Sequence, residues 1–368
     1  MLKILEVENV GSINEKVTLD FTKAGYTYKE NMLCNKGMNT NPHAIFGANG
    51  SGKTIILRVF QTLQAIMVEP VNGLNLFIPN IEHGNNKDSK IRIVFEYQSH
   101  VFDYEINTRF FGEDKINKER LMVNDVDLTR EHERIILKSK YNEEVIKTTN
   151  IKYSAIRQIG IEKHEESSAK HLISIAYEYL SSINYIDVRG DVFGSITQKH
   201  ILNRLLVEKS KDVNKLLKKY NNFPVYELSL SDRKSNERQS LLFKREGTSV
   251  FMPEFLMSNG MRNHSIILTI ILQMKKGTLL VVDELERSLH PFVASQFIEE
   301  LNNNFDIQLI FSSHNTNLLK SLRPDQIFFS KWDEKKNQSN YNKLSDTYPN
   351  IREINNIEKM YYGGLLDE

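Results

Sequence analysis

Apolar and polar positions alternate near both ends of the chain, which predicts strands there. The opening segment MLKILEVENV alternates with a period of two, and 91–96 forms another strand-like run. Fully apolar runs at 44–46 and 279–282 indicate buried strands, and 54–68 has the spacing of a helix. From about 225 to 368 strands and helices alternate again. The pattern predicts that residues 1–125 and 225–368 are two halves of one α/β domain.

The middle of the chain carries apolar residues at helical spacing within Lys-, Glu- and Asn-rich stretches. One apolar face consists of Leu172, Ile173, Ile175, Ala176, Tyr179 and Leu180. A second consists of Ile201, Leu205, Leu206, Val213, Leu216 and Leu217. We therefore expect 126–224 to be a mainly helical insertion or lid between the two halves.

The segment after the apolar run 44–46 satisfies the phosphate-loop pattern GxxxxGK[ST] in full. It consists of Gly47, Ala48, Asn49, Gly50, Ser51, Gly52, Lys53 and Thr54. The glycines let successive backbone N–H groups point at phosphates, and the helix that follows adds its positive end. Lys53 is expected to contact the β- and γ-phosphates of ATP, and the Thr54 hydroxyl to bind Mg²⁺.

A second apolar run, 277–282, ends in Asp283 and Glu284. A buried parallel strand delivers such carboxylates to the sheet edge where open α/β sheets bind ligands. We expect Asp283 to hold Mg²⁺ through water, and Glu284 to orient and deprotonate the attacking water. An acid pair after an apolar strand is also common in solvated loops, so the upstream phosphate loop is what favours this interpretation.

Composition limits the remaining possibilities. The 48 Lys and Arg nearly cancel the 47 Asp and Glu, so any nucleic-acid binding must come from a local patch. The single cysteine, Cys34, excludes an internal disulfide framework and suits a reducing cytosol. The longest apolar stretches fall short of the roughly 20 residues that span a bilayer, so no membrane segment is expected. The start of the chain lacks signal-peptide features, which favours a cytoplasmic protein.

Three further segments, in order, resemble the ABC-type ATPases. Leu256-Met-Ser258-Asn-Gly260 resembles the ABC signature, and Glu286-Arg-Ser-Leu-His290-Pro291 resembles the loop that crosses the dimer axis in SMC-like ATPases. The segment 308–315, with His314, resembles the switch motif that contacts the γ-phosphate. The resemblance is closest to stand-alone AAA-family ATPases of bacterial abortive-infection loci, such as the RloA and AbiLi types. Relatives often carry a basic residue where this chain has Gly11, and no glutamine in 81–90 matches their lid-coupling residue.

The resemblance implies an α/β phosphate-loop NTPase of the ABC type. Such a protein has a mixed central sheet flanked by helices, an antiparallel β subdomain and, here, a helical insertion. It also implies that Ser258 and Gly260 contact the ATP bound to a second protomer, in a homodimer or higher homo-oligomer. The expected cofactors are ATP and Mg²⁺, and the expected catalytic residues are Glu284, Lys53 and His314.

Other groups of residues have simpler interpretations. Asp125 and Asp127 favour a hairpin turn over a metal site. His164 and His171 lie among Glu and Lys without a nearby cysteine, which favours an ordinary surface. The sequence also contains two runs of basic residues. Such runs are usually solvated faces, but these two are the best candidates for a patch that binds nucleic acid. They comprise Lys209, Lys211, Lys215, Lys218 and Lys219, and Arg233, Lys234, Arg238, Lys244 and Arg245.

The functional hypothesis is an ATPase that closes as a dimer on ATP and gates a separately encoded effector, a nuclease or toxin, in anti-phage defence. One alternative is an SMC-like ATPase of DNA repair or chromosome maintenance, although no long heptad array is present. Another is a nucleotide-dependent assembly scaffold in which hydrolysis is incidental.

Overall fold

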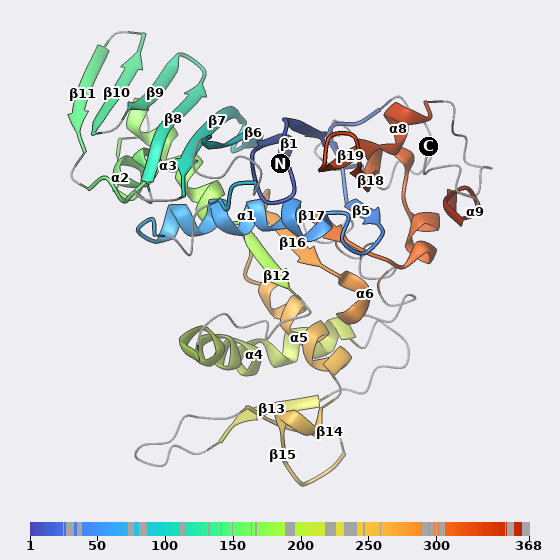
Figure 1. Ribbon diagram of the computed structural model, residues 1–368. Helices are drawn as coiled ribbons and strands as arrows, with labels where there is room; N and C mark the ends of the chain where they lie inside the picture. Colours follow the sequence, from blue (N-terminus) through green and yellow to red (C-terminus); the bar gives the residue numbers. More distant parts are fainter. Residues whose placement is uncertain are drawn as a thin grey trace.

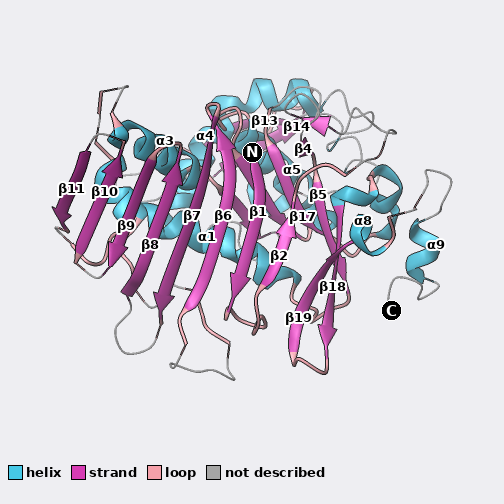
Figure 2. Ribbon diagram, turned by 90° about the horizontal axis from the view of Figure 1, so that it is seen from above, coloured by secondary structure: helices cyan, strands magenta, loops and turns pink. Residues whose placement is uncertain are grey.

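Two sheets form the body of the protein in the computed structural model (Figures 1 and 2). The described residues are 1–24, 26, 33–34, 39–72, 77–80, 87–110, 115–131, 133–140, 142–148, 150–162, 164–165, 168–187, 196–217, 226–231, 241–245, 247–257, 259–288, 294, 298, 301, 306–349, 351 and 357–362. The first sheet has eight strands in the order β11-β10-β9-β8-β7-β6-β1-β2, and its pairs are antiparallel. The second has six strands in the order β12-β16-β17-β5-β18-β19.

The antiparallel sheet consists of long strands with one buried face. Its strands are β1 (Leu2–Glu8), β2 (Val17–Asp20), β6 (Ser89–Tyr97), β7 (His100–Arg109), β8 (Lys115–Val123), β9 (Val126–Glu131), β10 (Arg134–Ser139) and β11 (Asn142–Lys147). In β6 buried residues alternate with more exposed ones, because one face packs on the core and the other faces solvent.

The second sheet is parallel apart from its edge strand β19. It consists of β12 (Asn184–Asp187), β16 (Leu279–Asp283), β17 (Gln308–Ser312), β5 (His43–Gly47), β18 (Ile327–Asp333) and β19 (Gln338–Lys343). Every residue of β5, β16 and β17 is buried. Continuous apolar runs are typical of parallel strands that are covered on both faces, and this confirms the interpretation of 44–46 and 279–282.

Helices cover both faces of the parallel sheet, and successive strand residues separate two cores. Ile45, Val281 and Ile310 face the core shared with the antiparallel sheet and α1 (Lys53–Val68). Phe46, Val282 and Phe311 lie in the second core, which includes residues of α5 (Asn259–Ile271). The helix α1 therefore lies between the two sheets, as the views in Figures 1 and 2 agree.

A smaller lobe lies below this body in Figure 1. It contains α4 (Ile196–Leu217), α5 and a three-stranded sheet of β13 (Tyr226–Leu230), β14 (Leu241–Arg245) and β15 (Met252–Pro253). Leu206, Leu241 and Ile266 form a small core that joins these elements.

The remaining described elements are short. They are β3 (Leu33–Cys34), β4 (Asn39–Thr40), α2 (Ala155–Gly160), α3 (Ala169–Ser181), α6 (Leu285–Ser288), α8 (Leu344–Thr347), α9 (Ile357–Tyr362) and 3₁₀ turns at Glu254–Leu256, Thr316–Ser321 and Pro324–Gln326. Ser168 caps α3 by accepting a hydrogen bond from the His171 backbone N–H. No helix within these described ranges combines 18 residues with the apolar composition needed to cross a membrane.

The expectation that the middle of the chain is mainly helical is wrong for 126–147. That segment forms β9, β10 and β11, which extend the antiparallel sheet. Their buried positions, such as Leu128, Ile135 and Leu137, alternate with Lys, Glu and Arg on the solvent face, and these charged residues obscured the period of two. Helices follow at α2, α3 and α4, but β12 between them belongs to the parallel sheet.

Candidate nucleotide and metal site

The predicted phosphate loop connects β5 to α1, so its strand–loop–helix context is confirmed. Gly52 precedes the helix in the left-handed conformation, with φ at 102°. A Cβ atom there would lie 2.2 Å from Ser339 Oγ of β19. Only glycine therefore fits, both for its φ and because β19 approaches so closely.

The side chains within the loop suit a bound triphosphate. Lys53 is 6% exposed, and its Nζ donates hydrogen bonds to the backbone oxygens of Gly47 at 2.9 Å and Ala48 at 2.8 Å. The buried hydroxyl of Ser51 has no hydrogen-bond partner among the described atoms. A buried cation and an unsatisfied hydroxyl in one glycine-rich loop fit a group that supplies several strong acceptor oxygens, as phosphates do.

The loop is joined directly to the acid strand. Thr54 Oγ1 donates a hydrogen bond to Asp283 Oδ2 at 2.8 Å, which connects residues 229 positions apart in the sequence. Asp283 is fully buried at the carboxyl end of β16. A hydroxyl and a carboxylate that converge at a sheet edge are oxygen ligands of the kind that Mg²⁺ prefers, so the donor set fits the expected ion.

Ser312, at the end of β17, organises both acids. Its hydroxyl donates to Asp283 Oδ1 at 2.5 Å and accepts from the Glu284 backbone N–H at 2.8 Å. Glu284 has a left-handed φ of 57°, which is uncommon for a residue with a side chain. The bond to Ser312 helps to hold Glu284 in this strained conformation. Ser312 was not predicted as a site residue, because serine near a strand end has no specific pattern.

The β18–β19 hairpin supports the loop from the other side, and the sequence did not indicate this either. Ser330 Oγ donates to the Ser51 backbone oxygen at 2.6 Å, and Tyr341 OH donates to the Gly52 backbone oxygen at 2.8 Å. The hairpin therefore anchors two backbone carbonyls of the loop and helps to fix its position.

Gly11, where the resemblance leads one to expect a basic residue, packs closely against α1. It lies in the turn after β1 with φ at 54°, and a Cβ atom there would be 2.8 Å from Ile55 Cγ2. Ile55 belongs to the first turn of α1, directly after the phosphate loop. A longer side chain at position 11 would require Ile55 to move.

The predicted switch histidine, His314, is linked to the segment that follows the acid pair. His314 is exposed two residues after β17, and its backbone N–H donates to Glu286 Oε1 of α6 at 2.7 Å. Glu286 Oε2 is buried and has no partner among the described atoms. His290 and Pro291, which continue the predicted dimer-axis loop, lie outside the described residues. The contact of the His314 ring with a γ-phosphate stays a prediction.

The segment predicted to be the ABC signature leads into α5. Gly260 lies in the first turn of this helix, and Ser258 lies outside the described residues. Figure 1 places α5 with the lower lobe, whereas α1 and β5 lie in the upper body. The role of Ser258 and Gly260 toward a second protomer stays a prediction.

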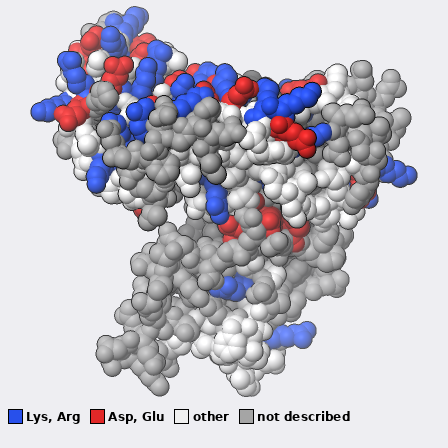
Figure 3. Space-filling view, in the orientation of Figure 1, with Lys and Arg blue, Asp and Glu red and all other residues white. Residues whose placement is uncertain are grey.

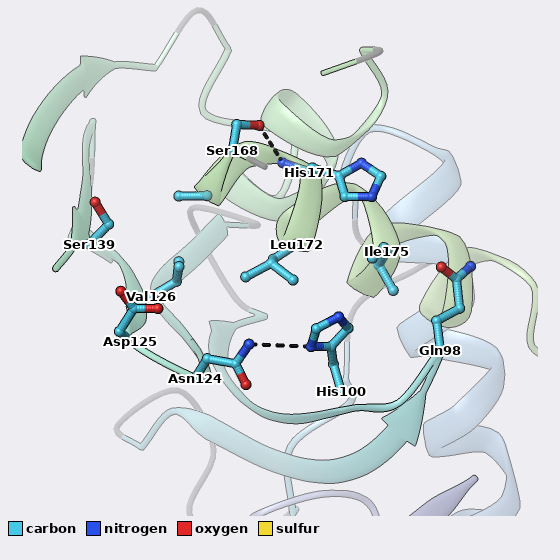
Figure 4. A pocket seen from close by; sticks show the side chains of 11 residues that line it. Gln98, His100, Asn124, Asp125, Val126, Ser139, Ser168, His171, Leu172 and Ile175 are labelled. Carbon is cyan, nitrogen blue, oxygen red and sulfur yellow. Dashed lines mark hydrogen bonds between the residues drawn. The ribbon is translucent and has the colours of Figure 1, made fainter. Parts of the chain in front are cut away.

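A hollow of about 500 Å³ lies away from this site, between the hairpin turns of the antiparallel sheet and α3 (Figure 4). Asn124 and Asp125 form the two-residue turn between β8 and β9, which confirms the hairpin interpretation of the Asp125–Asp127 segment. Asp127 forms an ion pair with Arg120 at 2.8 Å. Across the part of the chain that the structure describes, no three His, Cys, Asp or Glu side chains converge as a metal site would require.

The candidate basic patches are only partly described. Lys209, Lys211 and Lys215 lie on α4, whereas Lys218, Lys219, Arg233, Lys234 and Arg238 lie outside the described residues. Lys244 forms an ion pair with Glu227 at 2.9 Å, which offsets its charge. In Figure 3 both signs are mixed over the upper body, and acidic side chains gather in the hollow between the body and the lobe. Nucleic-acid binding stays a prediction.

Comparison with known proteins gives a family and a similar solved structure. No curated protein matches the sequence. One similar solved structure is the SMC head domain from Thermotoga maritima, with 13% sequence identity, a TM-score of 0.47, and coverage of 93% of this chain and 98% of that chain. The family model described as "AAA domain, putative AbiEii toxin, Type IV TA system" matches residues 43–320, from β5 to the turn after His314. Because this match spans most of the chain, the protein belongs to that family of AAA ATPase domains.

Proposed function

We propose that this protein binds Mg-ATP between two copies of itself, hydrolyses it, and thereby switches an effector protein, a nuclease or toxin, in anti-phage defence. The observation that carries the proposal is the Thr54–Asp283 hydrogen bond of 2.8 Å. It brings the phosphate loop and the acid strand to one point at the carboxyl edge of the parallel sheet, where such sheets bind ligands.

Each residue has a role that follows from its position. Lys53 and the loop N–H groups would hold the phosphates, while Thr54 and Asp283 would hold Mg²⁺, which supplies positive charge to the phosphoryl oxygens when bound. Glu284 would orient a water and accept its proton, since it follows Asp283 directly at the same strand end. Ser312 would position both acids, because its hydroxyl donates to the Asp283 carboxylate and accepts from the Glu284 backbone N–H.

The dimer part of the proposal comes from the order of the motifs and from their separation. The signature helix α5 belongs to the lower lobe and the phosphate loop to the upper body (Figure 1). A second copy that presents Ser258 and Gly260 would complete the site, and the lobe would move when ATP closes the pair. The defence role and the effector rest on the resemblance to abortive-infection ATPases.

A mixing experiment tests whether sites are shared between copies. Lys53→Ala and Ser258→Arg proteins are each expected to lack ATPase activity. A 1:1 mixture should regain about a quarter of wild-type activity, because half of the dimers are mixed and each has one intact site of two. No recovery, with mixed dimers demonstrated by differential tags, would contradict the shared site.

A second experiment separates hydrolysis from scaffolding. Glu284→Gln protein should bind ATP like the wild type but lose at least a hundredfold in turnover, as expected when a general base is removed. Cells that carry the variant with its neighbouring genes should lose phage resistance in plating assays. Full resistance with no ATP turnover would show that hydrolysis is incidental and would favour the scaffold alternative.

A further inference from the structure

A third carboxylate lies at the same sheet edge as Asp283. The strand β12 pairs in parallel with β16, and Asp187 is the register partner of Asp283. Adjacent strands lie about 4.8 Å apart, and paired residues direct their side chains to the same face. Asp187 is thus placed beside the predicted metal ligand, one strand away.

Contacts with α1 identify the face that the two acids share. Asp283 accepts the hydrogen bond from Thr54, and Asp187 Oδ2 lies 3.7 Å from Arg58 Nη2. Thr54 and Arg58 are four residues apart on α1, so they occupy the same side of the helix, one turn apart. Both carboxylates therefore face the first two turns after the phosphate loop.

The electrostatic surroundings favour a cation at this position. Asp283 is fully buried at the end of β16, and the side chain of Asp187 beside it is 23% exposed. The side chain of Arg58 is 56% exposed and lies 3.7 Å from Asp187, so this ion pair is a weak one. Two carboxylates side by side gain most from a divalent ion.

We propose that Asp187 is a third acid of the magnesium site and accepts a hydrogen bond from a water bound to the ion held by Thr54 and Asp283. The inference rests on the proposed Mg-ATP function and deepens it. Protein-bound Mg²⁺ keeps several of its waters, so a carboxylate one strand away can contribute without direct ligation. The next described element after Asp187 is α4 of the lower lobe, so the metal site lies at a point where the chain passes from body to lobe.

The test measures metal binding without relying on turnover. Mn²⁺ affinity in the presence of ATP can be followed by electron paramagnetic resonance for wild-type, Asp187→Asn, Asp187→Glu and Arg58→Gln proteins. We expect Asp187→Asn to weaken Mn²⁺ binding by about tenfold or more, the usual effect of removing an outer-shell metal contact. ATP affinity in EDTA should stay within about twofold of wild type, because the phosphate loop is unchanged.

The other variants distinguish a metal role from a structural ion pair. Asp187→Glu should restore much of the Mn²⁺ affinity, and Arg58→Gln should leave it unchanged or raise it. Equal losses in Asp187→Asn and Arg58→Gln would show that the pair only shapes the fold and would overturn the inference. Unchanged Mn²⁺ affinity in Asp187→Asn would also overturn it. If the wild type itself binds no Mn²⁺ with ATP, the proposed Mg-ATP function fails as well, and the wild-type arm alone reveals this.

Discussion

At the residue scale, the site depends on a few hydrogen bonds made by residues that carry no motif. Ser312 bridges Asp283 and the backbone of Glu284, and Tyr341 holds the carbonyl of Gly52. These contacts fix groups whose own geometry is strained or crowded, such as Glu284 at φ 57°. Positioning of this kind matters because small displacements of catalytic groups reduce rates strongly.

Ser312→Ala is expected to reduce ATP turnover far more than stability. The change removes the hydroxyl from Asp283 and leaves the buried Glu284 N–H unsatisfied, a cost of about 1–3 kcal/mol in unfolding free energy. Loss of orientation at Glu284 should lower kcat by at least about tenfold with ATP affinity nearly unchanged. Steady-state kinetics and urea unfolding measure both effects, and Ser313→Ala, at a neighbouring buried serine, is the control. Wild-type kcat in Ser312→Ala would contradict the role of Ser312.

At the element scale, a buried polar network ties the antiparallel sheet to the chain before α2. Arg130 of β9 and Glu119 of β8 form an ion pair at 3.0 Å, each with a side chain 1% exposed. Arg130 also donates to the backbone oxygens of Tyr153 and Ile151, and Glu119 accepts from the Ala155 backbone N–H. Burial raises the pKa of Glu119, and the nearby Arg130 opposes that shift.

Arg130→Leu should destabilise the protein by about 3–5 kcal/mol, because Glu119 would be left buried without its charge partner. The double variant Glu119→Leu with Arg130→Leu should recover part of this loss, since it removes both charges. Urea unfolding of the two variants and the wild type gives the comparison. The exposed pair Arg120–Asp127 provides a matched control, for which Arg120→Leu should cost no more than about 1 kcal/mol. A similarly small loss for Arg130→Leu would mean that the network is not important for stability.

At the scale of the whole molecule, α1 connects the parts. It lies between the antiparallel and parallel sheets and begins at the phosphate loop. The buried Gln308 of β17 exchanges two hydrogen bonds with the backbone of Leu2, which fixes the position of one sheet against the other. The helix that begins at the phosphate loop therefore packs against both sheets.

Stability of the whole protein should fall as the pH is lowered from about 6.5 toward 4, in part because of His264. This residue of α5 is fully buried, and burial lowers its pKa from 6.5 to about 4. In that window the unfolded chain binds a proton that the folded chain excludes, so unfolding becomes easier as pH falls. His264 accounts for a loss of at most roughly 3 kcal/mol in unfolding free energy, reached when the pH is below both pKa values.

His264→Leu removes that contribution without adding a charge. Urea unfolding at pH 7.5 and pH 5 should show a smaller difference for the variant than for the wild type. Identical pH slopes for the two proteins would contradict the assignment to His264. His43, whose pKa is also lowered by burial, remains in both proteins and so cancels in the comparison.

The sequence by itself determined the parts of the protein whose signals are local. The glycines of 47–54 and the apolar strands that end at Gly47 and Asp283 predict the loop and the buried sheet, because each depends on neighbouring residues alone. The apolar face of α3 was predicted for the same reason, and on α4 Leu206 and Val213 of the predicted face are buried. The outer strands β9–β11 were missed, because charged residues on a solvated sheet face look like the charges of a surface helix.

Only the tertiary structure decided which distant residues meet. Ser312 reaches Asp283 and Glu284, Tyr341 reaches the phosphate loop, Asp187 lies beside Asp283, and Gly11 lies against Ile55, because elements far apart in the sequence pack together. Register is set by burial summed over whole sheets, and no short stretch of sequence contains that information. The motifs that carry the chemistry were therefore predictable from the sequence. The residues that position them could be identified only from the structure, where β5, β12, β16, β17 and the β18–β19 hairpin come together.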